Sequence, residues 1–167
     1  IGGARTAMLV ASDGNALPQQ LFVDLRRAGW PVSPVVEGRI QIGGRSFRLL
    51  GIEPVTLPGE AGHAPALARG ELQAFITPPG LMLAAPETLS DLKLAEGERP
   101  QTNDRRPLPP LRQQPSLAPG VLVVDIGIAQ QVLDMKDRVS RLLVGKTGKK
   151  LVPLASVAGL RLQLVEP

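Results

Sequence analysis

Asp125 is the first residue whose position could serve chemistry, because it ends the apolar run Val121 to Val124 just before a helix-like pattern. A carboxylate at the end of a buried strand can act as a general acid or base if a second carboxylate, a histidine or a metal set lies nearby. No such partner motif lies close to it in the sequence. The same position suits an N-cap, whose side chain accepts hydrogen bonds from the first backbone N–H groups of a helix. We therefore predict that Asp125 closes a strand and caps a helix.

The tripeptide Gly145-Lys146-Thr147 follows a strand-like run, as the end of a phosphate-binding loop does. The complete motif needs another glycine five positions before this glycine and a helix after the threonine. Ser140 occupies the upstream position, and Pro153 lies shortly downstream, where the opening of a helix is poor. The sequence therefore favours a solvated turn over a phosphate-binding loop.

His63 is the only histidine, and it lies in the stretch PGEAGHAPA. A catalytic base needs a rigid scaffold beside a nucleophile, and the G-x-S-x-G nucleophile elbow is absent. The chain has no cysteine, which excludes disulfides, thiol chemistry and Cys-based metal sites, and no carboxylate cluster accompanies the histidine. We therefore expect no catalytic, cofactor-binding or metal-binding residue, and no enzyme.

The basic residues are scattered, although the formal net charge is +4 and the isoelectric point about 10.1. Aromatic residues make up 2% of the chain, which disfavours nucleic-acid binding because stacking platforms are missing. The small basic groups are Arg105-Arg106 with Arg112, and Lys146 with Lys149-Lys150. Charged turn residues are usually just solvated, and the alternative is contact with lipid headgroups or an acidic partner. Trp30 follows a helix stop and is expected to be a core or rim anchor.

Hydrophobic periodicity and turn residues predict an alternation of short strands and helices. Strands are predicted at 4–12, 32–42, 45–52, 80–85, 120–125, 138–145 and 160–166. Helices are predicted at 17–30, 86–94 and 126–135, with a short helix or turn at 70–76, a polar hairpin at 95–111 and a polar turn at 146–150. Gly43-Gly44 between two strand-like runs is a strong hairpin signal.

This order predicts an α+β fold, with a largely antiparallel sheet built from β-α-β units and short helices on one face. A smaller mixed lobe, 55–119, is inserted mid-chain into a discontinuous lobe formed by 1–54 and 120–167. At 43% hydrophobic residues the chain can build a core, and no apolar run approaches the roughly 20 residues of a membrane helix. The start at Ile1 without methionine, and the finish just after a strand-like run, suggest a piece of a longer protein.

Several phrases keep the order found in one known family. IGGARTAMLV opens the chain, RRAGWPVSPVV follows a helix, and GIEP at 51–54 closes a hairpin. LMLAAPETLSDLKLAEGE at 81–98, VVDIGIAQQVLD and SRLLV at 140–144 follow in sequence. This ordered set resembles the extracytoplasmic domain of ABC-transporter permeases of the MacB/FtsX-like family. The resemblance spans nearly the whole chain and supports a structural junction, rather than a catalytic group, at Asp125.

The resemblance implies a non-catalytic domain at the periplasmic face of the bacterial inner membrane, which transmits conformational change from cytoplasmic ATP hydrolysis. The implied partners are transmembrane helices outside this segment, a cytoplasmic ATP-binding subunit, and an envelope partner protein or lipid-linked substrate, but no nucleic acid. The cargo stays open among lipoprotein, lipid, peptide and drug. The alternative function is a free-standing periplasmic protein-binding or secretion scaffold module.

Overall fold

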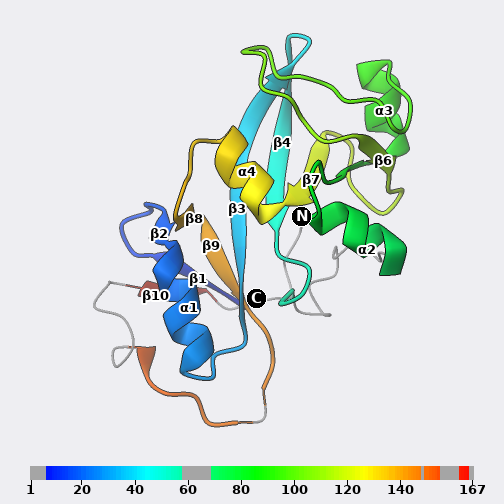
Figure 1. Cartoon of the computed structure of the whole chain (residues 1–167). Helices are drawn as coiled ribbons and strands as arrows, with labels where there is room; N and C mark the ends of the chain where they lie inside the picture. The colour runs from blue at the N-terminus through cyan, green and yellow to red at the C-terminus, as the bar shows by residue number, and fades with distance from the viewer. Residues whose placement is uncertain (1–6, 58–68, 148, 155–161, 166–167) are drawn as a thin grey trace.

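The computed structural model of the chain describes residues 7–57, 69–147, 149–154 and 162–165 (Figure 1). A sheet of eight strands runs through the described part, in the order β10-β1-β9-β3-β4-β7-β5-β6. In that order the strands are Leu162–Val165, Ala7–Ala11, Arg141–Val144, Val32–Ile42, Arg45–Ile52, Val121–Asp125, Met82–Ala84 and Leu111–Gln113. A second, two-stranded sheet pairs β2 (Leu17–Pro18) with β8 (Arg138–Val139). The predicted α+β class with a largely antiparallel sheet is confirmed.

The parallel pairs of the large sheet are β4 with β7 and β5 with β6, and the other described pairs are antiparallel. The longest hairpin joins β3 to β4 through Gly43 and Gly44, with φ of 57° and 79°. Positive φ at both turn positions is the geometry that twists a two-residue turn to match its strands, and glycine adopts it without steric cost. The hairpin predicted from this glycine pair is confirmed.

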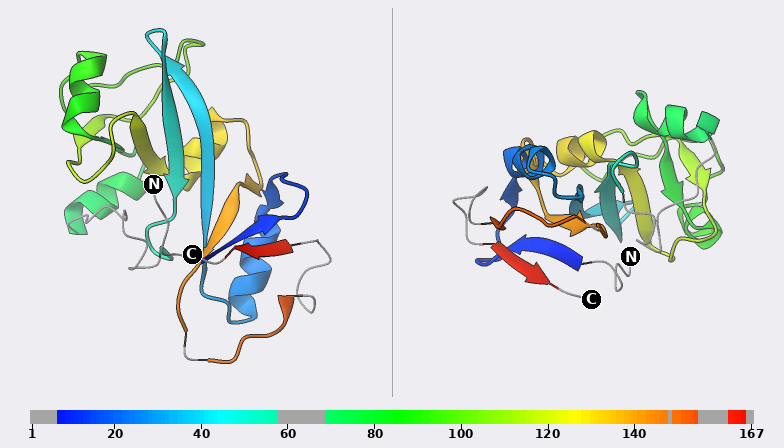
Figure 2. Two further views of the ribbon diagram at one scale, coloured as in Figure 1. Left: turned by 180° about the vertical axis from the view of Figure 1, so that it is seen from behind. Right: turned by 90° about the horizontal axis from the view of Figure 1, so that it is seen from below.

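The four described helices are α1 (Gln19–Arg27), α2 (Arg69–Ile76), α3 (Pro86–Leu92) and α4 (Ile126–Val132). Leu25 of α1, Leu89 of α3 and Ala129 of α4 belong to one buried cluster, and α1 and α4 lie on the same side of the sheet (Figure 2). Phe75 of α2 belongs to the cluster on the other face. Three helices therefore share one face of the sheet, and α2 packs on the opposite face.

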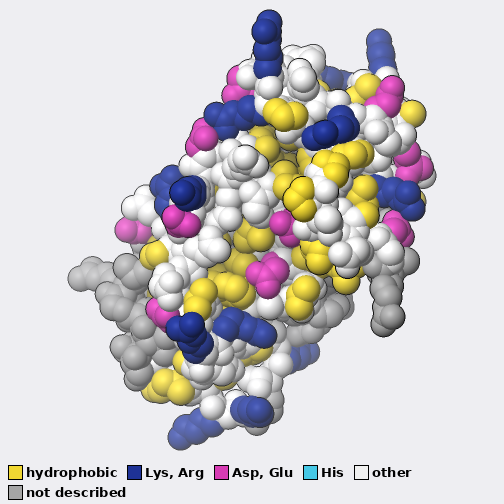
Figure 3. Space-filling view, viewed as in Figure 1, with side chains coloured by type: hydrophobic (Ala, Val, Ile, Leu, Met, Phe, Trp, Pro, Cys, Tyr) yellow, Lys and Arg dark blue, Asp and Glu magenta, His cyan; other side chains and the backbone are white. Residues whose placement is uncertain are grey.

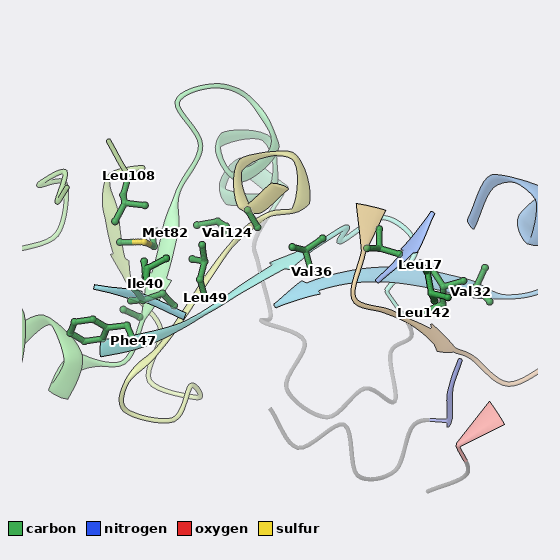
Figure 4. Close-up of a cluster of buried hydrophobic side chains, with 14 of the residues drawn as sticks. Leu17, Val32, Val36, Ile40, Phe47, Leu49, Met82, Leu108, Val124 and Leu142 are labelled. Carbon is green, nitrogen blue, oxygen red and sulfur yellow. The ribbon is translucent and has the colours of Figure 1, made fainter. Parts of the chain in front are cut away.

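The larger buried cluster runs the length of the sheet (Figure 4). Met82 and Leu108, from the segment predicted as an inserted lobe, lie near Ile40 of β3, whereas Leu17 and Leu142 lie at the far end. Strands β5 and β6 extend the sheet from β7, so the inserted segment shares both the sheet and the core with the flanking segments. The division into two lobes stays a prediction.

The stretch 138–145, predicted as one strand, forms two strands in different sheets. The break falls at Ser140, whose backbone N–H donates to the Val35 carbonyl at 2.8 Å while its hydroxyl accepts from the Glu37 N–H at 2.9 Å. The serine side chain replaces a backbone partner and lets the chain change sheets. Likewise, the helix predicted from residue 17 begins at Gln19, because Leu17 and Pro18 pair with β8.

The stretch 95–111 forms turns with a single bridge between Gln101 and Pro107, rather than a regular hairpin. Its end starts β6, which the sequence analysis did not predict as a strand. The Gly97 N–H donates to the Leu111 carbonyl, and the Leu111 N–H donates to the Glu98 carbonyl. This loop therefore hydrogen-bonds to β6, the edge strand, and covers part of its backbone.

Candidate functional site

Two carboxyl groups lie at neighbouring strand ends, where the parallel strands β4 and β7 finish together. Ile52 pairs with Asp125, so Glu53, the next residue, lies beside the end of β7. Asp125 Oδ2 accepts a hydrogen bond from the Gly127 N–H at 3.2 Å and forms the N-cap of α4. The predicted N-cap is thereby confirmed, and the structure adds a second carboxylate beside it.

The environment of these carboxyl groups disfavours their charged forms. Burial raises the pKa of Asp125 above its ordinary value, although hydrogen bonds from the Gly127 and Ile126 N–H groups act in the opposite direction. Burial also raises the pKa of Glu53, and the negative charge of Asp125 adds to this rise, while Thr56 and the positive charge of Arg26 oppose it. Both carboxyl groups are therefore protonated more easily in the folded protein than in water.

An open cleft of ≈ 390 Å³ begins at Asp125 and lies between α4 and two proline-bearing segments. Its apolar lining consists of Ile76, Pro78, Pro79, Pro107, Pro109 and Ile128. Arg99, Asp125 and Gln131 provide its polar side chains. Figure 3 shows hydrophobic side chains gathered on this face of the molecule, with acidic side chains at the border of the patch.

The walls of the cleft are fixed by short-range contacts. Gly80 has φ of 77°, and an added Cβ there would lie 2.6 Å from Ile128 Cδ1 and 3.2 Å from the Phe75 carbonyl oxygen. Only glycine lets the segment after Pro79 approach α4 this closely. On the other wall, Arg99 Nε donates to the Leu108 carbonyl at 3.0 Å. The cleft is therefore formed before any ligand arrives.

Arg106 attaches the 101–107 loop to the C-terminal end of α4. Its Nη1 donates to the Val132 carbonyl at 2.7 Å, and its Nη2 donates to Asp134 at 2.7 Å. A cation suits this place because the carbonyl groups at a helix C-terminus lack intrahelical partners. The prediction that Arg106 is merely solvated is therefore wrong, because distant residues supply its acceptors. Its neighbour Arg105 is exposed, with φ of 66°.

We expect Arg106→Gln to loosen the 101–107 loop from α4, because glutamine cannot reach the same acceptors. In the parent, the backbone N–H of residue 106 donates to the Thr102 hydroxyl at 2.9 Å. Hydrogen exchange of this amide should accelerate in the variant. Arg105→Gln is the matched control, since it removes the same charge one residue away and should leave exchange unchanged. Equal protection in the two variants would contradict the attachment.

The remaining residues considered in the sequence analysis have structural contacts or lie at the surface. The Gly145 N–H donates to the Pro31 carbonyl at 2.7 Å, so this amide is already engaged and does not point to a phosphate site. Trp30 is buried, and its Nε1 donates to the Val152 carbonyl at 2.8 Å, as expected of an anchor. Arg112 pairs with Glu71 of α2 at 3.1 Å.

Lys146, Lys149 and Lys150 are exposed, as predicted for turn residues. His63 lies outside the described residues. Among the residues that the structure describes, no group of three or more His, Cys, Asp or Glu side chains is placed to hold a metal ion. Within the same residues, no helix is long and apolar enough to cross a membrane.

We expect Asp125→Ala to destabilise the fold by about 1 kcal/mol through loss of the cap, whereas Asp125→Asn keeps the cap. The raised pKa adds a pH dependence with a definite sign. Protonation of Asp125 is favoured in the folded state. Its contribution to the free energy of unfolding is therefore greatest below the unfolded pKa of 3.8, and it declines as pH rises through the folded pKa. Asp125→Asn should therefore gain stability relative to the parent between about pH 3 and 7. Urea denaturation of the three proteins across this range measures both effects, and a constant difference between the parent and Asp125→Asn would contradict the assignment.

No family model matches the chain, and no curated protein matches it. Solved structures do. The periplasmic region of MacB from Actinobacillus actinomycetemcomitans matches with a TM-score of 0.60 and 13% identity, over 98% of this chain and 89% of that one. The extracellular domain of the noncanonic ABC-type transporter YknZ from Gram-positive bacteria matches with a TM-score of 0.61 and 10% identity, over 96% and 100%. The chain therefore has the fold of the extracytoplasmic domains of the ABC-type transporters MacB and YknZ.

Proposed function

We propose that the chain is the periplasmic domain of an ABC transporter permease, a non-catalytic part that transmits conformational change and contacts a substrate or partner protein. The observation that carries this proposal is the fold likeness to two such extracytoplasmic domains over 96% or more of the chain. In the proposed setting, the domain continues into transmembrane helices of the bacterial inner membrane. A cytoplasmic ATP-binding subunit supplies the energy.

The pairing of β1 with β10 supports insertion between two membrane helices. Strands β1 and β10 are antiparallel neighbours, with Met8 opposite Val165 (Figure 2). The start of β1 and the finish of β10 therefore lie side by side at one edge of the sheet. A domain inserted between two adjacent helices needs its incoming and outgoing chains close together.

The same geometry supports the proposal that one lobe connects to the membrane and the other contacts the substrate or partner. The lobe formed by 1–54 and 120–167 contains β1 and β10, and so would connect to the membrane. The lobe formed by 55–119 would face the substrate or partner. The continuous sheet and the Arg106 attachment would let a movement at the membrane reach the outer lobe.

The absence of cysteine makes the location testable with a single label. Ser12 is exposed in the turn after β1, so Ser12→Cys introduces one reactive thiol with little change in size. In the full-length protein, with any cysteine outside these 167 residues replaced by serine, a membrane-impermeant maleimide applied to cells with a permeabilised outer membrane should label this thiol. Labelling only after the inner membrane is opened would overturn the periplasmic assignment.

A second experiment tests transmission. Replacing residues 7–165 of the full-length protein by a flexible linker should abolish transport, while the isolated chain should neither bind nor hydrolyse ATP. Transport that persists after the replacement would contradict a transmitting role. A full-length protein without apolar segments of about 20 residues on either side would favour the free-standing scaffold instead.

A further inference from the structure

The cleft beside α4 combines apolar walls with a carboxylate that the fold leaves unneutralised. Ile76 is 41% exposed on one wall, although it is a large apolar side chain. Among the described residues, no Lys or Arg nitrogen lies within 4.0 Å of the Asp125 carboxylate, and its hydrogen bonds come from backbone N–H groups. Arg26 partly offsets the charge of Glu53 but is not among the groups that affect Asp125. The end of the cleft therefore keeps a negative charge available to an occupant.

The walls determine how an occupant can bind. Proline has no backbone N–H. The wall prolines, Pro78, Pro79, Pro107 and Pro109, therefore cannot donate the backbone hydrogen bonds that would hold an incoming segment as an added strand. An occupant must therefore bind through side chains that fill the apolar space. Arg99 and Gln131 line the same cleft and can donate hydrogen bonds to backbone carbonyl groups of an extended chain. A bare acyl chain has no such acceptors.

The charge of the site argues against anionic lipid. Asp125 lines the cleft and Glu53 lies beside Asp125, so a phosphate headgroup placed at Asp125 would face one or two carboxylates at short range. Arg99, the cation in the lining, already donates to the Leu108 carbonyl. A lysine or arginine side chain would instead supply the opposite charge that Asp125 lacks. The volume of ≈ 390 Å³ is enough for one or two side chains.

We propose that this cleft binds an extended segment of a partner protein, which inserts an apolar side chain between α4 and the proline-bearing walls and pairs an adjacent lysine or arginine with Asp125. The inference rests on the proposed function in one respect, namely that the partner protein binds on the periplasmic side. Preformed walls favour such binding because little order has to be created when the segment docks. The occupant is thus recognised by one apolar contact and one charge pair.

Two substitutions separate the apolar contact from the charge. Gly127 lines the cleft, and an added Cβ there would meet only Asp125 Oδ2, at the ordinary contact distance of 3.4 Å. Gly127→Phe therefore adds a large side chain at the cleft without a clash at its Cβ. Asp125→Asn removes the charge and keeps the cap. Gly70→Phe is the matched control, since Gly70 lies in α2 with open space around it and does not line the cleft.

The probe is a random octapeptide library displayed on phage and panned against the 167-residue chain. Selected peptides should carry an apolar residue next to lysine or arginine. Synthetic copies should bind at least tenfold more weakly to Gly127→Phe, and several-fold more weakly to Asp125→Asn, but equally to Gly70→Phe. Acetylation of the selected lysine should remove the difference in affinity between the parent protein and Asp125→Asn. Fluorescence of Trp30 verifies that each variant is folded.

Several outcomes would overturn the proposal. These are a library that yields no binder, selected peptides without a basic residue, or peptides whose affinity is indifferent to Gly127→Phe. Binding of vesicles of anionic phosphatidylglycerol that Gly127→Phe abolishes would assign the cleft to lipid instead. None of these results bears on the maleimide labelling or the linker replacement, so failure of the cleft proposal is distinguishable from failure of the proposed function.

Discussion

Replacing Gly51 by alanine is expected to destabilise the fold by about 1–3 kcal/mol, because the added methyl group has no space beneath α4. A Cβ at this position would lie 2.4 Å from Ala129 Cβ and 3.0 Å from Ile126 Cα. The second contact is with backbone, which cannot rotate away as a side-chain end can. Helix α4 would therefore have to rise from the sheet, and the Asp125 cap and the cleft would shift with it. Chemical denaturation followed by Trp30 fluorescence measures the loss.

The matched control is Gly70→Ala, which makes the same chemical change in open space. Because Gly70 lies in α2, alanine there should leave stability unchanged or raise it by about 0.5–1 kcal/mol. Adding Ala129→Gly to Gly51→Ala should recover part of the loss, since it removes the closer contact but leaves Ile126 in place. If Gly51→Ala were as stable as Gly70→Ala, close packing of α4 on β4 would be wrong.

Replacing Glu37 by glutamine is the second large effect that we expect, because Glu37 links three adjacent strands of the sheet. It lies on β3 and accepts hydrogen bonds from Arg48 of β4 and from Arg141 of β9, the latter at 2.8 Å. Arg141 is 17% exposed at its side chain, so removing the shared carboxylate leaves a largely buried cation without this partner. We expect the free energy of unfolding to fall by about 1–2 kcal/mol at pH 7, after allowing for screening by solvent at a partly exposed site.

The pH dependence of this loss has the opposite sign to that at Asp125. Burial alone would raise the pKa of Glu37, but the hydrogen bonds and charges of Arg48 and Arg141 outweigh it and lower the pKa from 4.5 to about 2. The folded state thus disfavours protonation, and the stabilisation is complete above pH 4.5 and declines as pH falls toward 2. The stability difference between Glu37→Gln and the parent should narrow over that range. Glu87→Gln, exposed on α3, is the control for the lost charge, and an equal pH profile in the two variants would contradict the assignment.

These two sites also bear on the proposed transmission. Glu37 connects β9, which pairs with β1 near the proposed membrane attachment, to β4, which pairs with β7 next to the cleft. Gly51 lets α4, a wall of that cleft, pack directly on β4. A movement applied at β1 would therefore reach the cleft through strand pairs and one tightly packed helix. Either substitution should weaken peptide binding less than Gly127→Phe does, because neither fills the cleft.

The sequence alone determined the local elements, because each depends on residues close together in the chain. Gly43-Gly44 predicted the β3–β4 hairpin, since positive φ at a two-residue turn is a local requirement. Pro86 predicted the start of α3, and Asp125 predicted the N-cap of α4, because capping involves residues within one turn. The ordered phrases also led to the correct fold, which the MacB and YknZ structures share.

Only the tertiary structure decided which of these elements meet. The parallel pairing of β4 with β7 brings Glu53 beside Asp125, although the whole segment 55–119 lies between them in the sequence, and no local pattern specifies that register. Gly51 lies inside the strand predicted at 45–52, and only the approach of Ala129 gives this glycine a packing role. Arg106 reads as a turn residue until the end of α4 supplies its acceptors. In each case the partner is distant in the chain, so its contribution depends on the packing of the sheet and helices and not on neighbouring residues.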